Sequence, residues 1–178
     1  YKMATFNLPA GTYEYKITAG NWDTNWGAGG NPGGDNIKFT TDGTPTHFVF
    51  NMDLGWSVAA NRSNMVTAPG SYQAKVGCSG DWQPDCLAST LFPQEDGMFR
   101  YQTDRLPIGD YEVKVAKGMA WGNDWGIDGG SANMAFSTTK DNEVVTVTWN
   151  PTNNVPTVET SEPQVPGVGS QAIWLDTT

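Results

Sequence analysis

The chain has 178 residues, and its 19 acidic and 10 basic side chains give a net charge of -9. Binding to nucleic acid is disfavoured, because phosphate recognition requires a concentrated surface of Lys and Arg. A membrane-spanning helix is not expected, because no apolar run approaches the roughly 20 residues that a span requires. With 21 Gly, 11 Pro and 8 Trp, the composition favours short strands and turns, with more aromatic rings than small cores bury.

One sequence pattern occurs twice along the chain. Residues 8–17 (LPAGTYEYKI) recur as residues 106–115 (LPIGDYEVKV). Each copy continues to a pair of tryptophans followed by glycine, at residues 22–27 (WDTNWG) and 121–126 (WGNDWG). The nearly constant offset indicates duplication of a whole module rather than a short solenoid repeat. Features that both copies keep are therefore the best guide to function.

Both copies predict β-strands, because apolar and polar residues alternate with a period of two. Residues 13–17 (YEYKI) alternate in the first copy, and residues 111–115 (YEVKV) and 145–149 (VTVTW) alternate in the second. Residues 47–50 (HFVF) are the shorter counterpart of the last of these strands. No window shows a helical stripe, and turn residues separate the strands. An all-β fold is expected, with one antiparallel β-sandwich in each copy.

The second copy has an opening that the first copy lacks. Residues 66–97 precede the shared pattern, and we expect them to contain a strand at 71–76, the two cysteines and an apolar stretch at 88–92. The first copy begins at Tyr1, which corresponds to about Phe99, so it lacks the equivalent residues. A sandwich without an edge exposes apolar surface and unpaired backbone. Either the chain is a fragment or another segment fills the gap.

These patterns predict three regions: an incomplete first module at residues 1–60, a complete second module at 66–150 and a Pro-rich tail at 151–178. The tail is expected to be a linker that leads to a further domain. The alternative is that residues 171–176 (QAIWLD) form a strand donated to the first module of a neighbouring molecule, so that the chain assembles with itself.

Cys78 and Cys86 are the only cysteines, and they lie close together in the chain. A zinc site would require four ligands, and the lone His47 belongs to the other copy. A local disulfide is therefore expected, closing a loop that presents Trp82. A disulfide indicates an oxidising compartment, so the protein is expected to be secreted.

The tryptophan pairs lie in loops rich in Gly, Asn and Asp, which suits a sugar ligand. A pyranose stacks an apolar C–H face on an aromatic ring, and its hydroxyl rim bonds to amides, carboxylates or lysines; rigid rings lose little entropy on binding. The candidate carbohydrate-binding residues are Trp22, Trp26, Asp23, Asn25 and Lys16 in the first copy, Trp121, Trp125, Asn123, Asp124 and Lys114 in the second, and Trp82 in the cysteine loop.

Each candidate also has a structural interpretation. One tryptophan of each pair is expected to fill the sandwich core, while at least one ring in each copy remains accessible. Trp82 fits the core and the rim equally well. Lys16 and Lys114 lie opposite the apolar face of their strands, where a solvated lysine is the default.

Catalytic residues are not expected. A Ser/His/Asp arrangement would require His47, and the second copy has Thr146 in its place. The carboxylates are numerous enough for a glycosidase pair, but Asp beside Trp is equally expected in a sugar-binding loop. The aspartates do not form an EF-hand loop. We therefore expect no cofactor, with a structural calcium ion as the alternative.

The string at residues 77–86 (GCSGDWQPDC), followed by the repeated patterns LPxGxYExK and WxxxWG, resembles the X25 module. X25 modules accompany bacterial pullulanases and amylopullulanases and occur in starch-adhering proteins. The resemblance covers residues 66–150 fully and residues 1–51 in part. Residues 172–177 (AIWLDT) resemble the join that leads into a pullulanase catalytic region.

The resemblance implies an immunoglobulin-like β-sandwich in each copy, which binds α-glucans by stacking its loop tryptophans on glucose units. The expected function is non-catalytic: a secreted tandem module that holds starch-like polysaccharide near an appended glycoside hydrolase domain. Two alternatives come from other classes. One is a structural or adhesive assembly subunit whose first module is completed by a donated strand, and the other is a spacer within a large enzyme.

Overall fold

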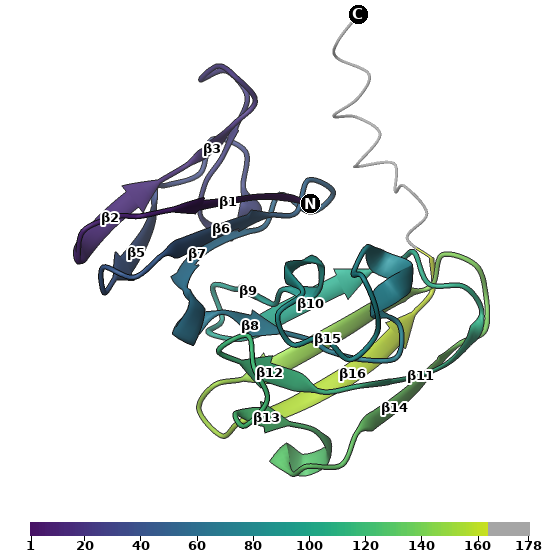
Figure 1. Cartoon of the computed structure of the whole chain (residues 1–178). Helices are drawn as coiled ribbons and strands as arrows, with labels where there is room; N and C mark the ends of the chain where they lie inside the picture. The colour runs from purple at the N-terminus through teal and green to yellow at the C-terminus, as the bar shows by residue number, and fades with distance from the viewer. Residues whose placement is uncertain (164–178) are drawn as a thin grey trace, which may run out of the picture.

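The computed structural model describes residues 1–163, and its regular elements are β-strands and a few short 3-10 turns (Figure 1). Every strand pair in this range is antiparallel, which confirms the all-β class and the sandwich type of fold. Within the same range, no helix is long and apolar enough to cross a membrane. The expected strand at residues 171–176 lies outside the described residues.

The first copy contains small sheets with the strand orders β1-β6-β7, β2-β5 and β3-β4. Its strands are β1 (Lys2–Phe6), β2 (Gly11–Tyr15), β3 (Ile17–Thr18), β4 (Asn25–Trp26), β5 (Ile37–Thr41), β6 (Thr46–Phe50) and β7 (Ser57–Asn61). The alternating residues 13–17 thus lie in β2 and β3, and residues 47–50 lie in β6, as their pattern predicts.

The second copy contains a four-stranded sheet in the order β16-β15-β10-β9, and two smaller sheets in the orders β11-β14 and β13-β12-β8. Its strands are β8 (Val66–Thr67), β9 (Phe92–Pro93), β10 (Phe99–Thr103), β11 (Gly109–Val113), β12 (Val115–Lys117), β13 (Asp124–Trp125), β14 (Met134–Thr138), β15 (Val144–Asn150) and β16 (Val155–Ser161). No sheet within residues 1–163 takes strands from both copies.

The last described strand lies in the region that the sequence predicts as a linker. β16 pairs with β15 along its whole length, from Val144 opposite Ser161 to Asn150 opposite Val155. Pro156 is tolerated there because β16 is an edge strand, which has ladder partners on one side only. The predicted boundary at Asn150 is therefore wrong, and the sheet of the second copy extends to Ser161.

The core of the second copy lies between its four-stranded sheet and the facing strands β11, β12 and β14. The opening of this copy completes the core with Tyr72 and Leu91, each 1% exposed. The Tyr72 ring lies 5.9 Å from the Tyr101 ring and 6.1 Å from the Phe136 ring, measured between centroids. The opening is thus a structural part of the sandwich.

The predicted strand at residues 71–76 is wrong, because a 3-10 turn (η3, Gln73–Val76) stands in its place. Neighbouring Tyr72 and Gln73 are both buried, and an alternating strand would bury only one of them. The Gln73 amide donates to the Gln83 carbonyl and to Ser89 Oγ, at 2.9 Å each, and accepts from the Gln83 N–H at 2.7 Å. These side-chain bonds take the place of strand pairing.

The core of the first copy is only half covered. Tyr13, Tyr15, Phe39 and Phe48 form an aromatic cluster with ring centroids 5.3–5.7 Å apart, yet all four residues remain partly exposed. In the second copy, the matching inward positions of β11 and β14 are buried. The difference follows from the opening, because no described segment covers the first core as residues 66–97 cover the second.

β1 is shifted by one residue relative to its counterpart β10. Lys2 lies opposite Phe50, whereas Phe99 lies opposite Trp149 at the equivalent place in the second copy. A shift of one residue moves each side chain to the other face of the strand. Tyr1 is therefore directed toward the second copy, where its ring stacks on Phe92 with 6.4 Å between the centroids.

The two copies pack directly against each other. Val49, Ala60 and Met65 form one buried cluster with Phe92 and Met119. Apolar residues that are far apart in the sequence are thus buried together between the copies. Their packing fixes how the two copies sit relative to each other.

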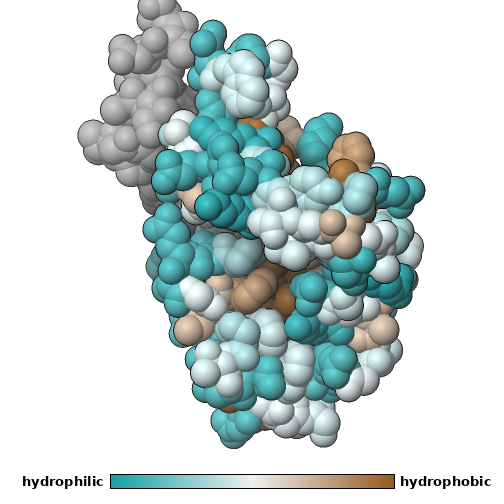
Figure 2. Space-filling view, turned by 90° about the vertical axis from the view of Figure 1, so that its left-hand side faces the viewer, coloured by the Kyte–Doolittle hydropathy of each residue, from teal (hydrophilic) through white to brown (hydrophobic). Residues whose placement is uncertain are grey.

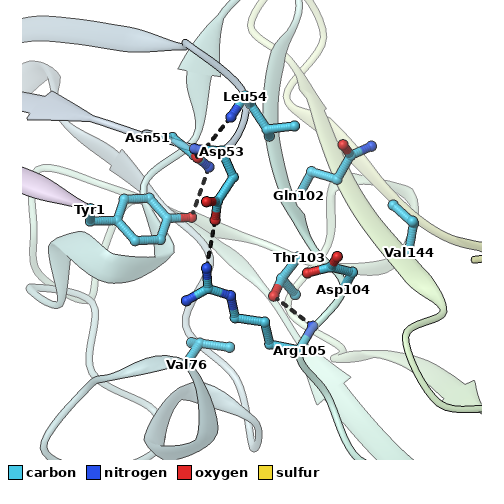
Figure 3. Close-up of a pocket in the computed structure, with 10 residues that line it drawn as sticks. All are labelled: Tyr1, Asn51, Asp53, Leu54, Val76, Gln102, Thr103, Asp104, Arg105 and Val144. Atoms are coloured by element: carbon cyan, nitrogen blue, oxygen red, sulfur yellow. Dashed lines mark hydrogen bonds and ion pairs between the residues drawn. The ribbon is translucent and has the colours of Figure 1, made fainter. Parts of the chain in front are cut away.

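A small cavity of about 190 Å³ opens at another part of this contact (Figure 3). Arg105 Nη2 and Asp53 Oδ2 form an ion pair at 2.6 Å across it, and Asn51 Nδ2 donates to the Tyr1 hydroxyl at 3.4 Å. Burial raises the pKa of Tyr1 well above its ordinary value, so its hydroxyl stays protonated. The cavity is smaller than the ~300 Å³ at which ligand pockets begin, so we assign it a structural role.

A disulfide joins Cys78 and Cys86, with 5.8 Å between their Cα atoms, as the sequence predicts. We expect replacement of both cysteines by Ala to lower the free energy of unfolding by about 2–3 kcal/mol, because the closed loop no longer restricts the unfolded chain. Urea unfolding followed by near-ultraviolet circular dichroism measures the change. Reduction of the unmodified protein should give the same shift, and an unchanged midpoint would contradict the expectation.

Candidate functional site

Each tryptophan pair lies in a short hairpin at the same place in its copy. β3 and β4 flank the first loop, and β12 and β13 flank the second. Trp26 lies opposite Ile17, and Trp125 lies opposite Val115. The second tryptophan of each pair is therefore a strand residue, and only the first lies in the loop itself.

The two tryptophans of each pair have different environments. Trp22 and Trp121 are 75% and 47% exposed. The Trp125 ring stacks on Trp149, with centroids 5.1 Å apart and an interplanar angle of 23°, and the Trp26 ring lies 5.4 Å from Phe50. In each copy, one ring thus packs against the end of the sheet while the other faces solvent.

A lysine directly before the first strand of each hairpin anchors the loop. Lys114 forms an ion pair with Asp124, and Asp124 Oδ2 accepts a hydrogen bond from the Gly122 N–H at 3.1 Å. The Lys114 side chain is only 11% exposed, so the default of a solvated lysine is wrong at this position. Its Nζ atom lies 6.0 Å from the centroid of the Trp121 ring, which adds a cation–π contact to the anchor.

The first copy has a similar anchor that uses an amide. Lys16 Nζ donates to Asn25 Oδ1 at 3.4 Å, and Asn25 Nδ2 donates to the Trp22 carbonyl at 2.8 Å. Asn21 Oδ1 accepts from the N–H groups of Asp23 and Thr24 at 3.0 Å each. Asn21 is not among the residues selected from the sequence, although a short amide before a turn is a known signal for such a cap.

The predicted hydroxyl partners thus divide into two groups. Asn25 and Asp124 are occupied by the lysine anchors, and the hydrogen bond from Lys114 lowers the pKa of Asp124 below its ordinary value. The side chains of Asp23 and Asn123 make no hydrogen bond within the described part of the chain and are exposed. The polar groups of these two side chains are therefore available to hydrogen-bond a ligand beside the exposed rings.

Trp82 lies apart from both tryptophan loops. It belongs to the disulfide loop, is half-buried and has a φ of 58°, in the left-handed region. Its backbone N–H donates to the Gly70 carbonyl at 3.1 Å. Within residues 1–163, its ring makes no aromatic contact with Trp22 or Trp121. Its place favours a role in shaping the opening of the second copy.

The described residues also bear on metal binding and on the role of His47. Within residues 1–163, no three side chains of His, Cys, Asp or Glu lie together as metal ligands would. His47 Nδ1 lies 3.0 Å from Thr5 Oγ1, so one nitrogen of its ring is engaged by a threonine. The arrangement offers aromatic faces and hydrogen-bonding groups, which suits recognition of a ligand.

The sequence profile described as "Pullulanase X25 domain" matches residues 1–57 and 65–156 of the chain. The chain belongs to this family. The match covers both copies, which confirms the X25 resemblance of the repeated patterns and of the cysteine string.

Several much longer proteins contain a region similar to this chain. The amylopullulanase of Thermoanaerobacter thermohydrosulfuricus is 27% identical over 130 residues, which are 68% of this chain and 8% of that protein. The amylopullulanase of Thermoanaerobacterium saccharolyticum is 26% identical over 147 residues, 77% of this chain and 11% of its own length. The chain thus spans about a tenth of the length of these relatives.

A region of a solved pullulanase structure is also similar to this chain. The pullulanase from Bacillus acidopullulyticus is 21% identical, with a TM-score of 0.48, and the match covers 56% of this chain and 12% of the pullulanase chain.

Asp124→Asn tests the loop anchor. A carboxylate whose pKa is lowered by folding adds stability above its ordinary pKa, and this stability is lost as the pH falls through the lowered pKa. We therefore expect the indole N–H resonance of Trp121 to shift between neutral and acidic pH in the unmodified protein. The shift should disappear in Asp124→Asn.

Asn is a matched replacement, because the first copy has Asn25 at this position and keeps its lysine contact. A shift of equal size in both proteins would show that another carboxylate is responsible.

Proposed function

We propose that the chain is a non-catalytic module that binds starch-like α-glucans through Trp22 and Trp121. The observation that carries this proposal is that the two tryptophans of each pair differ in the same way in both copies. One tryptophan holds the hairpin on the sandwich, and the other presents its ring to solvent on an anchored loop. A solvent-exposed tryptophan is unfavourable unless it meets a partner, and two at matching places point to one kind of ligand.

The chemistry around the rings supports a sugar. Asp23 and Asn123 lie beside the exposed rings and have no partner within the described residues, so they are available to hydroxyl groups. The loops are held by Lys16 and Lys114, so little conformational entropy is lost when a ligand binds. The net charge of -9 favours a neutral ligand over an anionic one.

The family supports an accessory role beside an enzyme. The similar proteins are named pullulanase and amylopullulanase, and the chain corresponds to a small part of each. We infer that the chain holds polysaccharide near an appended glycoside hydrolase domain. Two sites on one polymer would add to the affinity by avidity. The disulfide between Cys78 and Cys86 supports an extracellular location.

Affinity electrophoresis in gels that contain amylopectin measures this binding. The unmodified protein should be retarded, and Trp22→Ala and Trp121→Ala should each weaken binding about tenfold, because truncation removes the stacking ring. The double variant should migrate as it does without glucan. Retardation should change little with salt, because an uncharged glucan releases no counterions when it binds.

Ile108→Ala is a matched control, because Ile108 is 60% exposed and lies outside both loops. It should be retarded like the unmodified protein. Equal mobility of the unmodified protein and both tryptophan variants would contradict the proposal.

The second candidate function is a structural or adhesive subunit, and the half-covered core of the first copy favours it. Such a core could accept a strand donated by a neighbouring molecule. The deletion that tests this must begin after Pro163, because β16 occupies residues 155–161.

We expect deletion of residues 164–178 to leave the elution volume in size-exclusion chromatography and the thermal midpoint unchanged. Loss of an assembly, together with a lower midpoint, would instead support strand donation by the tail and the structural function.

A further inference from the structure

A groove runs between the two copies on the side that Figure 2 turns toward the viewer. Its volume is about 700 Å³, within the ~300–1,000 Å³ of small-molecule sites. One wall consists of the turn between β5 and β6 and of the 3-10 turn η2 (Arg62–Asn64). The other wall is the loop that carries Trp121. In Figure 2 the hollow has apolar residues at its bottom and residues of polar or intermediate hydropathy around it.

A buried asparagine holds the wall from the first copy. Asn61 is 2% exposed, and its Oδ1 atom accepts a hydrogen bond from the Asp42 N–H at 3.1 Å. Its Nδ2 atom donates to the Thr44 carbonyl at 2.8 Å and to Thr41 Oγ1 at 3.0 Å. The hydrogen bonds of Asn61 therefore hold the turn at residues 42–45 in place, and no ligand is needed to order it.

The anchored tryptophan loop forms the wall from the second copy. Trp121 lines the groove while remaining 47% exposed, and the Lys114–Asp124 ion pair fixes the base of its loop. Lys117 and Asn123 also line the groove, and their side chains make no hydrogen bond to any described residue. This wall thus offers an aromatic face beside a free cation and a free amide.

The two walls are joined, so the groove is formed before a ligand binds. Arg62 Nη2 donates to the Met119 carbonyl at 2.9 Å, which connects η2 directly with the tryptophan loop. Beneath this bond, Met65 and Met119 belong to the buried cluster between the copies. A preformed site avoids the entropy that two independent modules would lose on closing around a ligand.

We propose that this groove binds a segment of α-glucan chain and that both copies build the site together. Trp121 is the stacking platform, with Lys117 and Asn123 as hydroxyl partners from the second copy. His47 and Asp42 are the hydroxyl partners from the first copy. Asp42 takes part through Oδ2, because its Oδ1 atom accepts hydrogen bonds from the Thr44 N–H and hydroxyl. The inference rests on the proposed function and extends it, because it makes the Trp121 site one that both copies build, rather than a site of the second copy alone.

The charges of the groove suit a neutral ligand with many hydroxyl groups. Arg62 and Lys117 are balanced in part by Asp42, so neither a polyanion nor a polycation matches both walls. Burial and the nearby Arg62 guanidinium lower the pKa of His47, which keeps its ring neutral at neutral pH. Because its Nδ1 atom lies 3.0 Å from Thr5 Oγ1, the Nε2 atom is the one left to bond a sugar hydroxyl.

The test uses Trp22→Ala as background, so that binding reports on the groove alone. Isothermal titration calorimetry with maltoheptaose measures the affinity of this protein and of further variants. We expect Trp121→Ala to abolish binding. We expect His47→Phe, which keeps a ring but removes both nitrogens, to weaken it by about three- to tenfold.

Ser63→Arg should also abolish binding, because Ser63 is exposed in η2 and a long side chain there fills the groove. Ser131→Arg is the matched control, since Ser131 is exposed in the second copy and does not line the groove. It should bind like the background protein. Thermal unfolding of each variant checks that the fold is retained.

Each outcome decides between the two proposals. Full affinity in Ser63→Arg and His47→Phe, with loss in Trp121→Ala, would overturn the shared groove and leave the proposed function intact. Absence of binding in the Trp22→Ala background, while the unmodified protein binds, would also overturn the groove. Absence of binding by the unmodified protein would instead overturn the proposed function.

Discussion

The stacking of one tryptophan against the end of each sheet is the contact on which the candidate site depends. Trp125 lies on Trp149, and Trp26 lies near Phe50 at the equivalent place. Because these rings already fill the end of the core, the first tryptophan of each pair has no buried position left to occupy. The lysine anchor then fixes the loop, so exposure of Trp121 is a consequence of packing rather than of a loose loop.

The outer faces of the equivalent strands β6 and β15 differ between the two copies. The outer face of β6 carries Val49, which packs into the cluster between the copies, whereas Thr148 holds the equivalent place on β15. The apolar outer face of the first copy compensates in part for its half-covered core, because it is buried against the second copy. Within residues 1–163, the second copy therefore has a completed sandwich, whereas the core of the first copy is half covered.

Local patterns in the sequence predict β2, β11 and β15, the two loops and the disulfide, because each depends on neighbouring residues. Local patterns do not predict β16, because Pro156 and the polar residues around it are typical of linkers. These residues form a strand because they pair with β15. For the site, the sequence predicts the tryptophan loops but not which ring is exposed. The burial of Lys114 and the groove depend on packing between distant segments, which no local pattern contains.

Asn61 is followed by Arg62 and Ser63, so it stands in an acceptor sequence for N-linked glycans. In the folded protein, the side-chain amide of Asn61 is buried and donates to the Thr44 carbonyl. A glycan on Asn61 could not fit in that place and would leave the turn at residues 42–45 without its support. In a host that glycosylates Asn61, this wall of the groove would therefore lose the hydrogen bonds that hold it.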